Sequence, residues 1–527
     1  MGGDIMSVKQ SHFPFVLCRI EPPPNTNVGD HDHRTNETGM AMAKEKGVFV
    51  ITLTNDHRRK WNIAAQANVL VLKNIRDSDF LPLIKQRKDQ GKITVYEIAD
   101  DFDDFEPWTP DGETLIRRIA GYCDALQVTS ARLKDLYGHL NPICRVFRNQ
   151  VCYVPPERIH RRRNGFVIGW EESHGSPEDM AEVAEALSEW IINEREAVLY
   201  LIASHPVWQL FERLPEDKKR RFSPGRVETH YDFLRHIDVG IGPLRDTPSN
   251  RSRSDVEYLE YAAFGVVPVI KRLAPYTDTI IHGKTGFLYT NSSDLVENLA
   301  LLSKDPMLLE GVAGAARNFV LQNRLEADQA VDRVEFYREL LLKTSGARDC
   351  RHLSHEVNGW AAMDGAVVTG RHIRLEPTKF ELLLREGLAA MRINEKRETC
   401  FRLFRRASAI EPCNYLPYLY GASLSPNSVE TLLKAVELNP SSLKARIMLG
   451  DALAQRGNPW EALRWFKTAA EVFSDYEIPY SKAASLLKQV GRSDQAAHLS
   501  EKSASLLGKG SFSAAPFEMI PAFSLHP

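Results

Sequence analysis

The sequence predicts two α/β lobes, each built on a parallel sheet, followed by an all-α region of helical repeats. Along the first 345 residues, short β-branched runs alternate with segments of helical periodicity, the pattern of strand–helix–strand units. From Phe380 onward the chain reads as helices, and a pattern recurs after 34 residues. A chain of 527 residues is also too long for one core. We therefore predict five segments: a first lobe (1–160), a second lobe (161–345), a linker (346–378), helical repeats (379–508) and a tail (509–527).

Apolar runs define the elements expected in the first lobe. Strands are expected where β-branched and aromatic residues cluster, at Phe13–Ile20, Gly47–Leu53, Val69–Leu72, Ile93–Ile98 and Asp124–Thr129. Helices are expected between them, at Thr38–Lys44, Ser78–Gln90 and Ser130–Leu136. Ser130 is placed to cap the last of these helices. This alternation predicts a parallel sheet covered by helices.

The second lobe repeats the alternation. Strands are expected at Phe166–Trp170, Val198–Ala203, Asp238–Ile241 and Val266–Ile270. Helices are expected to begin at Pro177 and to cover Asp255–Phe264, Ser293–Leu302, Pro306–Gln322 and Asp328–Leu341. The stretch Asp238–Ile270 is a complete crossover unit of a parallel sheet, because a strand, a loop, a helix ended by Gly265 and a second strand follow in order.

The loop inside this crossover unit has the composition of a phosphate site. It follows the strand Asp238–Ile241, and open α/β sheets bind ligands at the carboxyl ends of their strands. Ser254 and Asp255 fall at a helix N-terminus, whose free N–H groups favour an anion. Arg253 and a second arginine in the same loop strengthen this interpretation, because guanidinium groups match phosphate geometry. An ordinary loop with solvated arginines is the alternative.

This stretch resembles the donor-binding signature of GT-B glycosyltransferases of the group 1 or family 4 type. The matching residues are Asn250, Arg253-Ser254, Glu260 and the run Gly265-Val266-Val267-Pro268-Val269-Ile270. The resemblance implies two Rossmann-like lobes, with Glu260 holding the ribose of a nucleotide donor and Arg253-Ser254 facing its diphosphate. The family often has a second glutamate eight residues before Glu260, where this chain has Ser252. Glu257 is the candidate substitute, although it lies only one helical turn from Glu260.

A second segment resembles the opening of the donor lobe in the same family. Gly169 ends a strand, Ser173 and His174 follow in a turn, and Pro177 begins a helix. A tight turn there would bring backbone N–H groups near the donor, so the resemblance adds Gly169, Ser173 and His174 to the donor-binding residues. An isolated histidine such as His174 is also often structural.

Two clusters in the first lobe are candidates for acceptor binding or catalysis. His31-Asp32-His33 follows the first strand, and the resemblance implies that this loop faces the cleft between the lobes. His31 and His33 are therefore candidate catalytic residues, with a surface loop and a zinc site as alternatives. Asp100 and Asp101 follow the strand Ile93–Ile98 and are candidate cleft residues, with a solvated acidic loop as the alternative. Asp101 and Asp103 also form a D-x-D pair, which GT-A glycosyltransferases use to hold a metal; that alternative would require a different fold.

Net charge, cysteine spacing and hydropathy exclude several classes of protein. The net charge of −2 argues against a nucleic-acid-binding protein. The seven cysteines contain no C-x-x-C pair, which indicates reduced thiols rather than a disulfide framework or zinc site. No apolar run approaches the roughly 20 residues of a membrane span, and no signal peptide is visible. We therefore expect a cytoplasmic protein without a transmembrane segment, with at most a peripheral association at the inner membrane face.

The last third of the chain resembles tetratricopeptide repeats. Gly450, Leu453, Gly457 and Ala462 recur 34 residues later as Ala484, Leu487, Gly491 and Ala496. Small residues at these positions let paired helices approach closely, and three to four such repeats would form a solenoid with a concave face. Plain helix packing is the alternative. The resemblance implies a protein partner for this region.

Together these features predict a glycosyltransferase that moves a sugar from a nucleotide-diphosphate donor to a protein or glycan acceptor in the cleft between the lobes. No cofactor and no metal are expected, since the nucleotide-sugar is a substrate and Arg253 with helix N–H groups would neutralise the leaving diphosphate. The alternative is a non-catalytic scaffold, in which the two lobes are a degenerate enzyme and the repeats bind protein.

Overall fold

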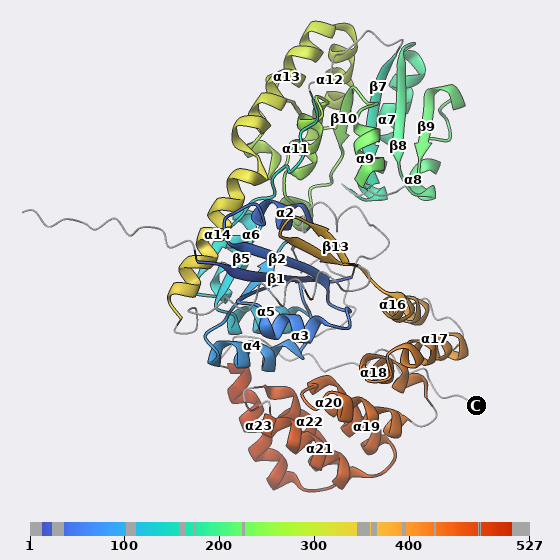
Figure 1. Ribbon diagram of the computed structural model, residues 1–527. Coiled ribbons are helices and arrows are strands. Elements are labelled where there is room, and N and C mark those ends of the chain that lie inside the picture. Colours follow the sequence, from blue (N-terminus) through green and yellow to red (C-terminus); the bar gives the residue numbers. More distant parts are fainter. Residues whose placement is uncertain are drawn as a thin grey trace, which may run out of the picture.

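The computed structural model describes residues 13–23, 36–101, 112–156, 165–172, 175–223, 227–344, 359, 366–392, 397–425, 428–472, 474 and 476–508. Two α/β lobes and a helical region follow one another along an elongated molecule, with the first lobe in the middle (Figure 1). This is the fold class that the sequence predicts.

The first lobe is built on an eight-stranded sheet in the order β13-β14-β2-β1-β3-β4-β5-β6. Its strands run parallel except for the antiparallel pair β13–β14. The bounds are β1 (Phe15–Glu21), β2 (Val48–Thr54), β3 (Val69–Lys73), β4 (Ile93–Ile98), β5 (Ala125–Val128), β6 (Cys144–Val146), β13 (Ala366–Thr369) and β14 (His372–Leu375). The helices of this lobe are α2 (Thr38–Met42), α3 (Lys60–Gln66), α4 (Phe80–Asp89), α5 (Gly112–Tyr122) and α6 (Ala131–Tyr137), with η3 (Gly138–Leu140) after α6. Ser130 caps α6 as expected, accepting a hydrogen bond from the backbone N–H of Leu133 at 3.1 Å.

The prediction of a linker at 346–378 is wrong for residues 366–375. These residues form the hairpin β13–β14, and β14 pairs with β2, so the hairpin extends the sheet of the first lobe. The signal was present in the sequence, because two valines, Gly370 and an alternating run His372–Leu375 are typical of a tight hairpin. Gly370 has a φ of 60°, which suits glycine at such a turn.

The second lobe is built on a six-stranded parallel sheet in the order β12-β11-β10-β7-β8-β9. Its strands are β7 (Phe166–Glu171), β8 (Ala197–Ile202), β9 (Lys219–Phe222), β10 (Val239–Gly242), β11 (Val267–Lys271) and β12 (Phe287–Tyr289). Its helices are α7 (Pro177–Asn193), α8 (His205–Gln209), α9 (Val227–Leu234), α10 (Pro248–Ser252), α11 (Val256–Ala263), α12 (Ser292–Lys304) and α13 (Pro306–Asn323), with η5 (Glu216–Lys218) and η6 (Tyr276–Asp278). The parallel pairing of β10 with β11 confirms the predicted crossover unit.

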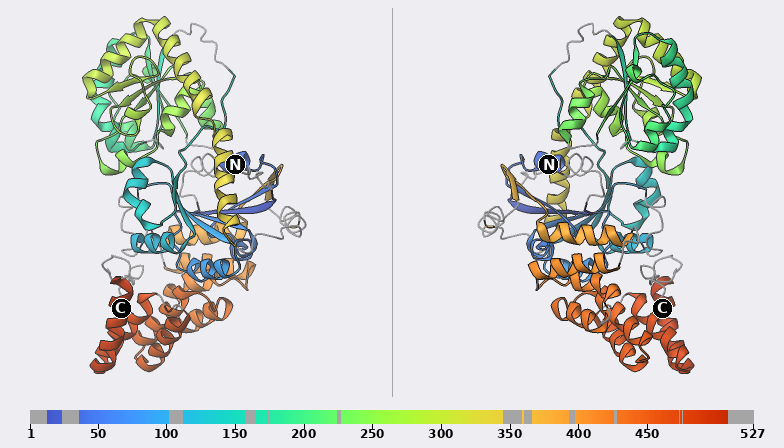
Figure 2. Two further views of the ribbon diagram at one scale, coloured as in Figure 1. Left: turned by 90° about the vertical axis from the view of Figure 1, so that its left-hand side faces the viewer. Right: turned by 90° about the vertical axis from the view of Figure 1, so that its right-hand side faces the viewer.

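Helix α14 (Glu326–Leu342) leaves the second lobe and packs on the first (Figure 2). Ala330, Val334 and Leu340 are buried in one apolar cluster with Phe15 and Val50 from the first sheet. The Tyr337 hydroxyl also donates a hydrogen bond of 2.9 Å to Oε1 of Gln127 on β5. The end of the second α/β segment therefore closes one face of the first sheet.

The helical region consists of helices that pack on their neighbours in sequence. They are α16 (Lys379–Arg392), α17 (Arg397–Ile410), α18 (Leu416–Gly421), α19 (Ser428–Leu438), α20 (Leu443–Gln455), α21 (Pro459–Val472), α22 (Glu477–Gln489) and α23 (Ser493–Gly508), with η7 (Ala422–Leu424). A Cβ atom on Gly450 would lie 2.3 Å from the ring of Phe466, so this glycine permits the close approach of α20 and α21. The tetratricopeptide assignment itself stays a prediction. Of all helices in the described parts of the chain, none combines the length and apolar character needed to cross a membrane.

The helical region is docked on the α3, α4 and α5 side of the first lobe (Figure 1). Trp61 and Leu81 pack against its apolar core, and Arg385 on α16 forms a bidentate pair with Asp56. The Tyr415 hydroxyl donates a hydrogen bond of 3.0 Å to Oδ2 of buried Asp79. Apolar packing and buried polar contacts therefore tie the helical region to the first lobe.

Burial and the neighbouring Asp77 carboxylate raise the pKa of Asp79 to about 6, while hydrogen bonds from Ser442 and Tyr415 act in the opposite direction. Tyr415→Phe removes one of these two donors from a buried carboxylate. We expect the free energy of unfolding to fall by about 1–3 kcal/mol, the usual cost of leaving a buried polar group without its partner. The measurement is denaturant unfolding of the full chain at neutral pH. Tyr418→Phe is the matched control, since the hydroxyl of that half-buried tyrosine donates to the nearby carbonyl of Pro412 and not to a buried carboxylate. Equal effects of the two variants would contradict this account of the interface.

Candidate functional site

The loop between β10 and α11 is more ordered than the sequence predicts. Residues 248–252 form the short helix α10, capped by Thr247, whose hydroxyl accepts a hydrogen bond from the backbone N–H of Asn250 at 3.2 Å. Pro248 at the first helical position favours this helix, whereas from the sequence alone we predict only a loop here. Helix α11 then begins at Val256, so its first turn lies at the carboxyl end of β10, where the anion site is expected.

Asp255, the residue before α11, is clamped by Arg324. The Arg324 guanidinium donates to both carboxylate oxygens, at 2.5 and 2.8 Å, and Thr279 Oγ1 donates to Oδ2 at 2.8 Å. Both side chains of this pair are buried. Arg324 also donates to Gln150 Oε1 at 2.7 Å and to the carbonyl of Asn149 at 3.0 Å. One guanidinium therefore fixes the start of α11 to the segment that leaves the first lobe.

The same segment forms a small bridge between the lobes. Val151 pairs with Leu325 in a parallel β-bridge, and its N–H donates to the carbonyl of Arg324 at 3.0 Å. Asn149 donates through Nδ2 to the Ser254 hydroxyl at 2.8 Å. Ser254, predicted to face a diphosphate, is therefore held by the interlobe connection just before α11 begins.

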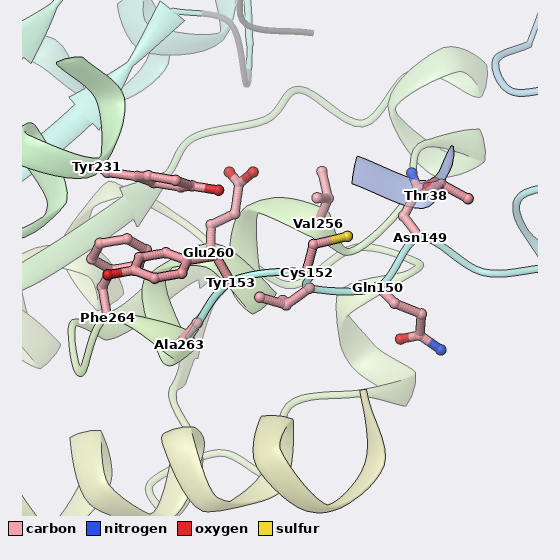
Figure 3. A pocket seen from close by; sticks show the side chains of 11 residues that line it. Thr38, Asn149, Gln150, Cys152, Tyr153, Tyr231, Val256, Glu260, Ala263 and Phe264 are labelled. Carbon is pink, nitrogen blue, oxygen red and sulfur yellow. The ribbon is translucent and has the colours of Figure 1, made fainter. Parts of the chain in front are cut away.

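Glu260 on α11 borders a pocket between the two lobes, which we call the groove (Figure 3). It lines a pocket with residues of the second lobe, of the connection between the lobes and of α2 in the first lobe: Thr38, Asn149, Gln150, Val151, Cys152, Tyr153, Tyr231, Val256, Ala263 and Phe264. Tyr153, Tyr231 and Phe264 pack together at one end in tilted and edge-to-face contacts, with ring centroids 5.1–6.1 Å apart. The carboxylate predicted to grip a ribose thus points into an aromatic groove that both lobes line.

His230 on α9 joins Glu260 to a second carboxylate. Its Nδ1 is hydrogen-bonded to Oε2 of Glu171 at the end of β7, and its Nε2 lies 3.4 Å from Oε2 of Glu260. Burial alone would lower the pKa of His230, but Glu260 and Glu171 raise it to about 10. His230 is therefore an imidazolium at neutral pH, between two carboxylates.

Glu257, the candidate substitute for the missing glutamate, is not in the groove. It is 1% exposed and accepts a hydrogen bond of 3.1 Å from the Tyr276 hydroxyl. Its Oε2 would lie 3.1 Å from a Cβ atom on Gly242, so it is enclosed beneath the end of β10. Arg253 is half-buried. It lies near this pair, because its charge counteracts the rise in the pKa of Tyr276 that burial and Glu257 cause.

Asn250 and Gly169 have structural neighbours. The Asn250 amide donates to Asp179 Oδ1 at 3.0 Å and to the carbonyl of Arg245 at 2.9 Å. Asp179 also accepts from Ser176 at the N-terminus of α7, so it ties the turn after β7 to the loop after β10. A Cβ atom on Gly169 would lie 2.5 Å from Ile237, which gives this glycine a packing role. Ser173 and His174 lie outside the described residues, as do His31 and His33.

Asp100 and Asp101 lie at the carboxyl end of β4, as predicted, but they have different partners. Asp100 accepts a hydrogen bond of 3.1 Å from Asn74 within the first lobe. Asp101 faces the second lobe, where the Ser252 hydroxyl donates to its Oδ2 at 2.8 Å, and Tyr137 donates to its Oδ1. A second bond between the lobes joins the Tyr231 hydroxyl to Glu37 Oε1 at 2.9 Å. Two carboxylates of the first lobe thus reach hydroxyls beside the candidate donor site.

The GT-A alternative is wrong as a fold, because the chain carries two separate, mainly parallel sheets rather than one. Asp103, its second metal ligand, lies outside the described residues. Within the described ranges, no group of three or more His, Cys, Asp and Glu side chains is placed to hold a metal ion.

Sequence reasoning missed His230, Glu171 and Tyr231. Glu171 directly follows the predicted strand Phe166–Trp170, and residues at strand ends often face a ligand edge. His230 and Tyr231 have no motif of their own, and only the fold brings their helix α9 against α11.

Comparisons with known proteins give remote structural similarity. No family model matches the chain, and no curated protein matches it. Among solved structures, Anabaena Alr3699/HepE in complex with UDP-glucose is 13% identical, with a TM-score of 0.47, over 62% of this chain and 100% of that one. A glycosyltransferase from Rickettsia africae is 15% identical, with a TM-score of 0.46, over 63% and 99%. Sucrose-phosphate synthase from Thermosynechococcus elongatus is 12% identical, with a TM-score of 0.46, over 62% and 99%. At these values, similarity alone says nothing about what this chain binds.

The clamp on Asp255 leads to a stability prediction. Arg324→Gln leaves a buried carboxylate without its cation, so we expect the free energy of unfolding to fall by about 3–5 kcal/mol. Thermal and denaturant unfolding at pH 7 are the measurements. Arg251→Gln is the control, because Arg251 makes a bidentate pair with Asp246 on the surface and its loss should leave unfolding unchanged. A small effect of Arg324→Gln, similar to that of the control, would show that the clamp does not fix α11.

Proposed function

We propose that this chain is a metal-independent glycosyltransferase that moves a sugar from a nucleotide-diphosphate donor to an acceptor in the cleft between the lobes. The observation that carries the proposal is the position of Glu260, whose carboxylate points into a groove lined from both lobes, on the same helix whose first turn lies at the end of β10. The ribose of a bound donor would lie at the Glu260 carboxylate, and the diphosphate attached to it would lie at the N-terminus of α11.

Each part of the donor has a suitable neighbour. The free N–H groups at the start of α11 and the Arg253 guanidinium suit a diphosphate, because both stabilise negative charge as it develops on the leaving group. Asp255 immediately precedes that first turn, but the Arg324 guanidinium offsets its charge. Next to Glu260, the partly exposed ring of Tyr153, which packs on Tyr231 and on buried Phe264, offers an aromatic face for a nucleobase.

The acceptor would lie on the first lobe, at the carboxyl ends of its strands. Asp100 and Asp101 stand at that edge, and Asp101 reaches the donor loop through Ser252. His31 and His33 remain candidates for a catalytic role by sequence. The acceptor would be a protein or a glycan, and the helical region would bring a protein partner or the acceptor to the cleft. A cytoplasmic location belongs to the same proposal, since the cysteines in the described parts of the chain are free thiols.

Donor binding is the direct test. We expect calorimetric titration of the full chain with UDP, GDP and ADP to show binding of at least one. Glu260→Gln should weaken that binding on the order of 10- to 100-fold, the worth of hydrogen bonds to a charged group. Arg253→Ala should weaken binding of the diphosphate more than binding of the nucleoside. Arg213→Ala is the control, because Arg213 is an exposed cation of the same lobe paired only with Glu185 on the surface.

A non-catalytic scaffold remains the second candidate, favoured by the engagement of Asn250 with Asp179 and of Ser252 with Asp101 inside the protein. These contacts use groups that a donor-binding loop would offer to its ligand. The scaffold predicts no binding of any nucleoside diphosphate, so the same titration separates the two functions.

Metal independence has its own test. Hydrolysis of the nucleotide-sugar, or its transfer, should continue unchanged in excess EDTA, since Arg253 and the N-terminus of α11 supply the positive charge. Loss of turnover in EDTA, restored by Mg²⁺ or Mn²⁺, would contradict this part of the proposal. Donor affinity measured with and without EDTA shows whether the metal acts on binding or on the chemical step.

A further inference from the structure

A buried histidine joins two carboxylates at the edge of the groove. His230 is 8% exposed and lies between Glu171 from β7 and Glu260 from α11. These three residues come from three separate elements of the second lobe. The proposed function assigns a role to Glu260 alone, so the presence of a cation behind it needs a separate explanation.

The cation decides the charge state of the groove carboxylate. Two carboxylates that share a buried site repel each other, and without a cation one of them would hold a proton at mildly acidic pH. A protonated carboxyl keeps fewer acceptor positions and can turn away from its ligand. An imidazolium between the two removes the repulsion and fixes the orientation of Glu260 by contact with its Oε2.

We propose that His230 is a positioning residue that keeps Glu260 ionised and aimed at the two vicinal hydroxyl groups of the donor's ribose. This inference rests on the proposed function. A carboxylate accepts from two hydroxyls at once only when both oxygens are unprotonated. The site therefore selects a ribonucleoside diphosphate over its 2′-deoxy counterpart, and His230 controls the size of that preference.

Other groups near His230 fit this role. Tyr231 follows it on α9, and its hydroxyl bonds Glu37 of the first lobe, while burial and Glu37 raise the pKa of Tyr231 well above its usual range. The phenol is neutral throughout the range that proteins tolerate, so it does not compete for the charge of His230. The titratable groups that face this cluster are Glu171 from β7, Tyr231 from α9, Glu260 and Tyr261 from α11, Cys152 from the interlobe connection and Glu37 from the first lobe.

His230 also contributes to stability, and this contribution has a defined pH dependence. Because the pKa of His230 is raised from an ordinary value near 6.5 to about 10, its stabilising effect is complete below pH 6.5 and is lost as the pH rises toward 10. A purely structural histidine would show this effect alone. A positioning residue must also change the preference for ribose.

The experiment measures a ratio of dissociation constants. The wild-type chain, His230→Gln and the control His236→Gln, a half-exposed histidine just after α9, are titrated with UDP, GDP and ADP and with their 2′-deoxy forms. Since each pair carries the same diphosphate, titration of the phosphate cancels in the ratio. We expect the wild-type ratio to stay constant from pH 6 to 8. In His230→Gln it should fall about five- to tenfold at pH 6 and partly recover at pH 8, as Glu260 regains its charge.

A thermodynamic cycle isolates the path through Glu260. His230→Gln should have no further effect on the ratio in a chain that already carries Glu260→Gln, because the carboxylate it positions is gone. A ratio unchanged by His230→Gln would overturn the inference, as would equal weakening of both nucleotides. If His230→Gln fails to fold, the wild-type ratio measured from pH 8 to 10.5 tests the orienting contact with Oε2 of Glu260, since carboxyl groups are ionised in this range and His230 loses the charge that holds that oxygen. The ratio should decline toward pH 10.5, and a constant ratio would overturn the positioning role.

Failure of this inference differs from failure of the proposed function. If the wild-type chain binds none of the nucleotides, the proposed function is wrong. If it binds them with a ribose preference that His230→Gln leaves intact, only the role of His230 is wrong.

Discussion

The buried pair of Arg324 and Asp255 is the interaction on which the arrangement of the two lobes depends. Arg324 lies at the point where the chain leaves the second lobe for α14, and it holds at once the start of α11 and the segment 149–150 that arrives from the first lobe. Taking two charges out of water is costly, so such a pair is stable only with good geometry and further hydrogen bonds. Here the carboxylate is bidentate and Thr279 supplies a third donor. Both chain crossings between the lobes are thereby tied to the helix that carries Glu260.

Around this clamp, the helix α11 separates its two glutamates by environment. Glu257 faces inward to tyrosine hydroxyls, whereas Glu260, three residues later, faces the groove and the imidazolium of His230. Residues three positions apart lie only about 60° apart around an α-helix, so the packing of Glu257 beneath the end of β10, and not the helical rotation, gives the two acids different surroundings. The same helix therefore supplies one acid that is enclosed beneath the sheet and one acid that lines the groove.

The first lobe serves as the centre of the molecule. One face of its sheet packs under α14 from the second lobe, while the side formed by α3, α4 and α5 holds the helical region. The contacts to the helical region include buried polar groups such as Asp79 and the bidentate pair of Arg385 with Asp56, which require fixed geometry. The helical region is thus positioned relative to the cleft, and whatever it binds would be held in a defined direction from the proposed acceptor edge.

The sequence by itself determined the elements whose signals are local. The crossover Asp238–Ile270, the capped helix after Ser130 and the end of α11 at Gly265 rest on apolar period and turn chemistry, which the chain expresses within about 15 residues. Only the tertiary structure decided which side chains meet: His230 with Glu260, Asp101 with Ser252, and the hairpin 366–375 with β2. These contacts join residues 30 to more than 300 positions apart, and no local propensity encodes such pairings. The sequence therefore located the groove acid, and the fold placed the imidazolium of His230 beside it.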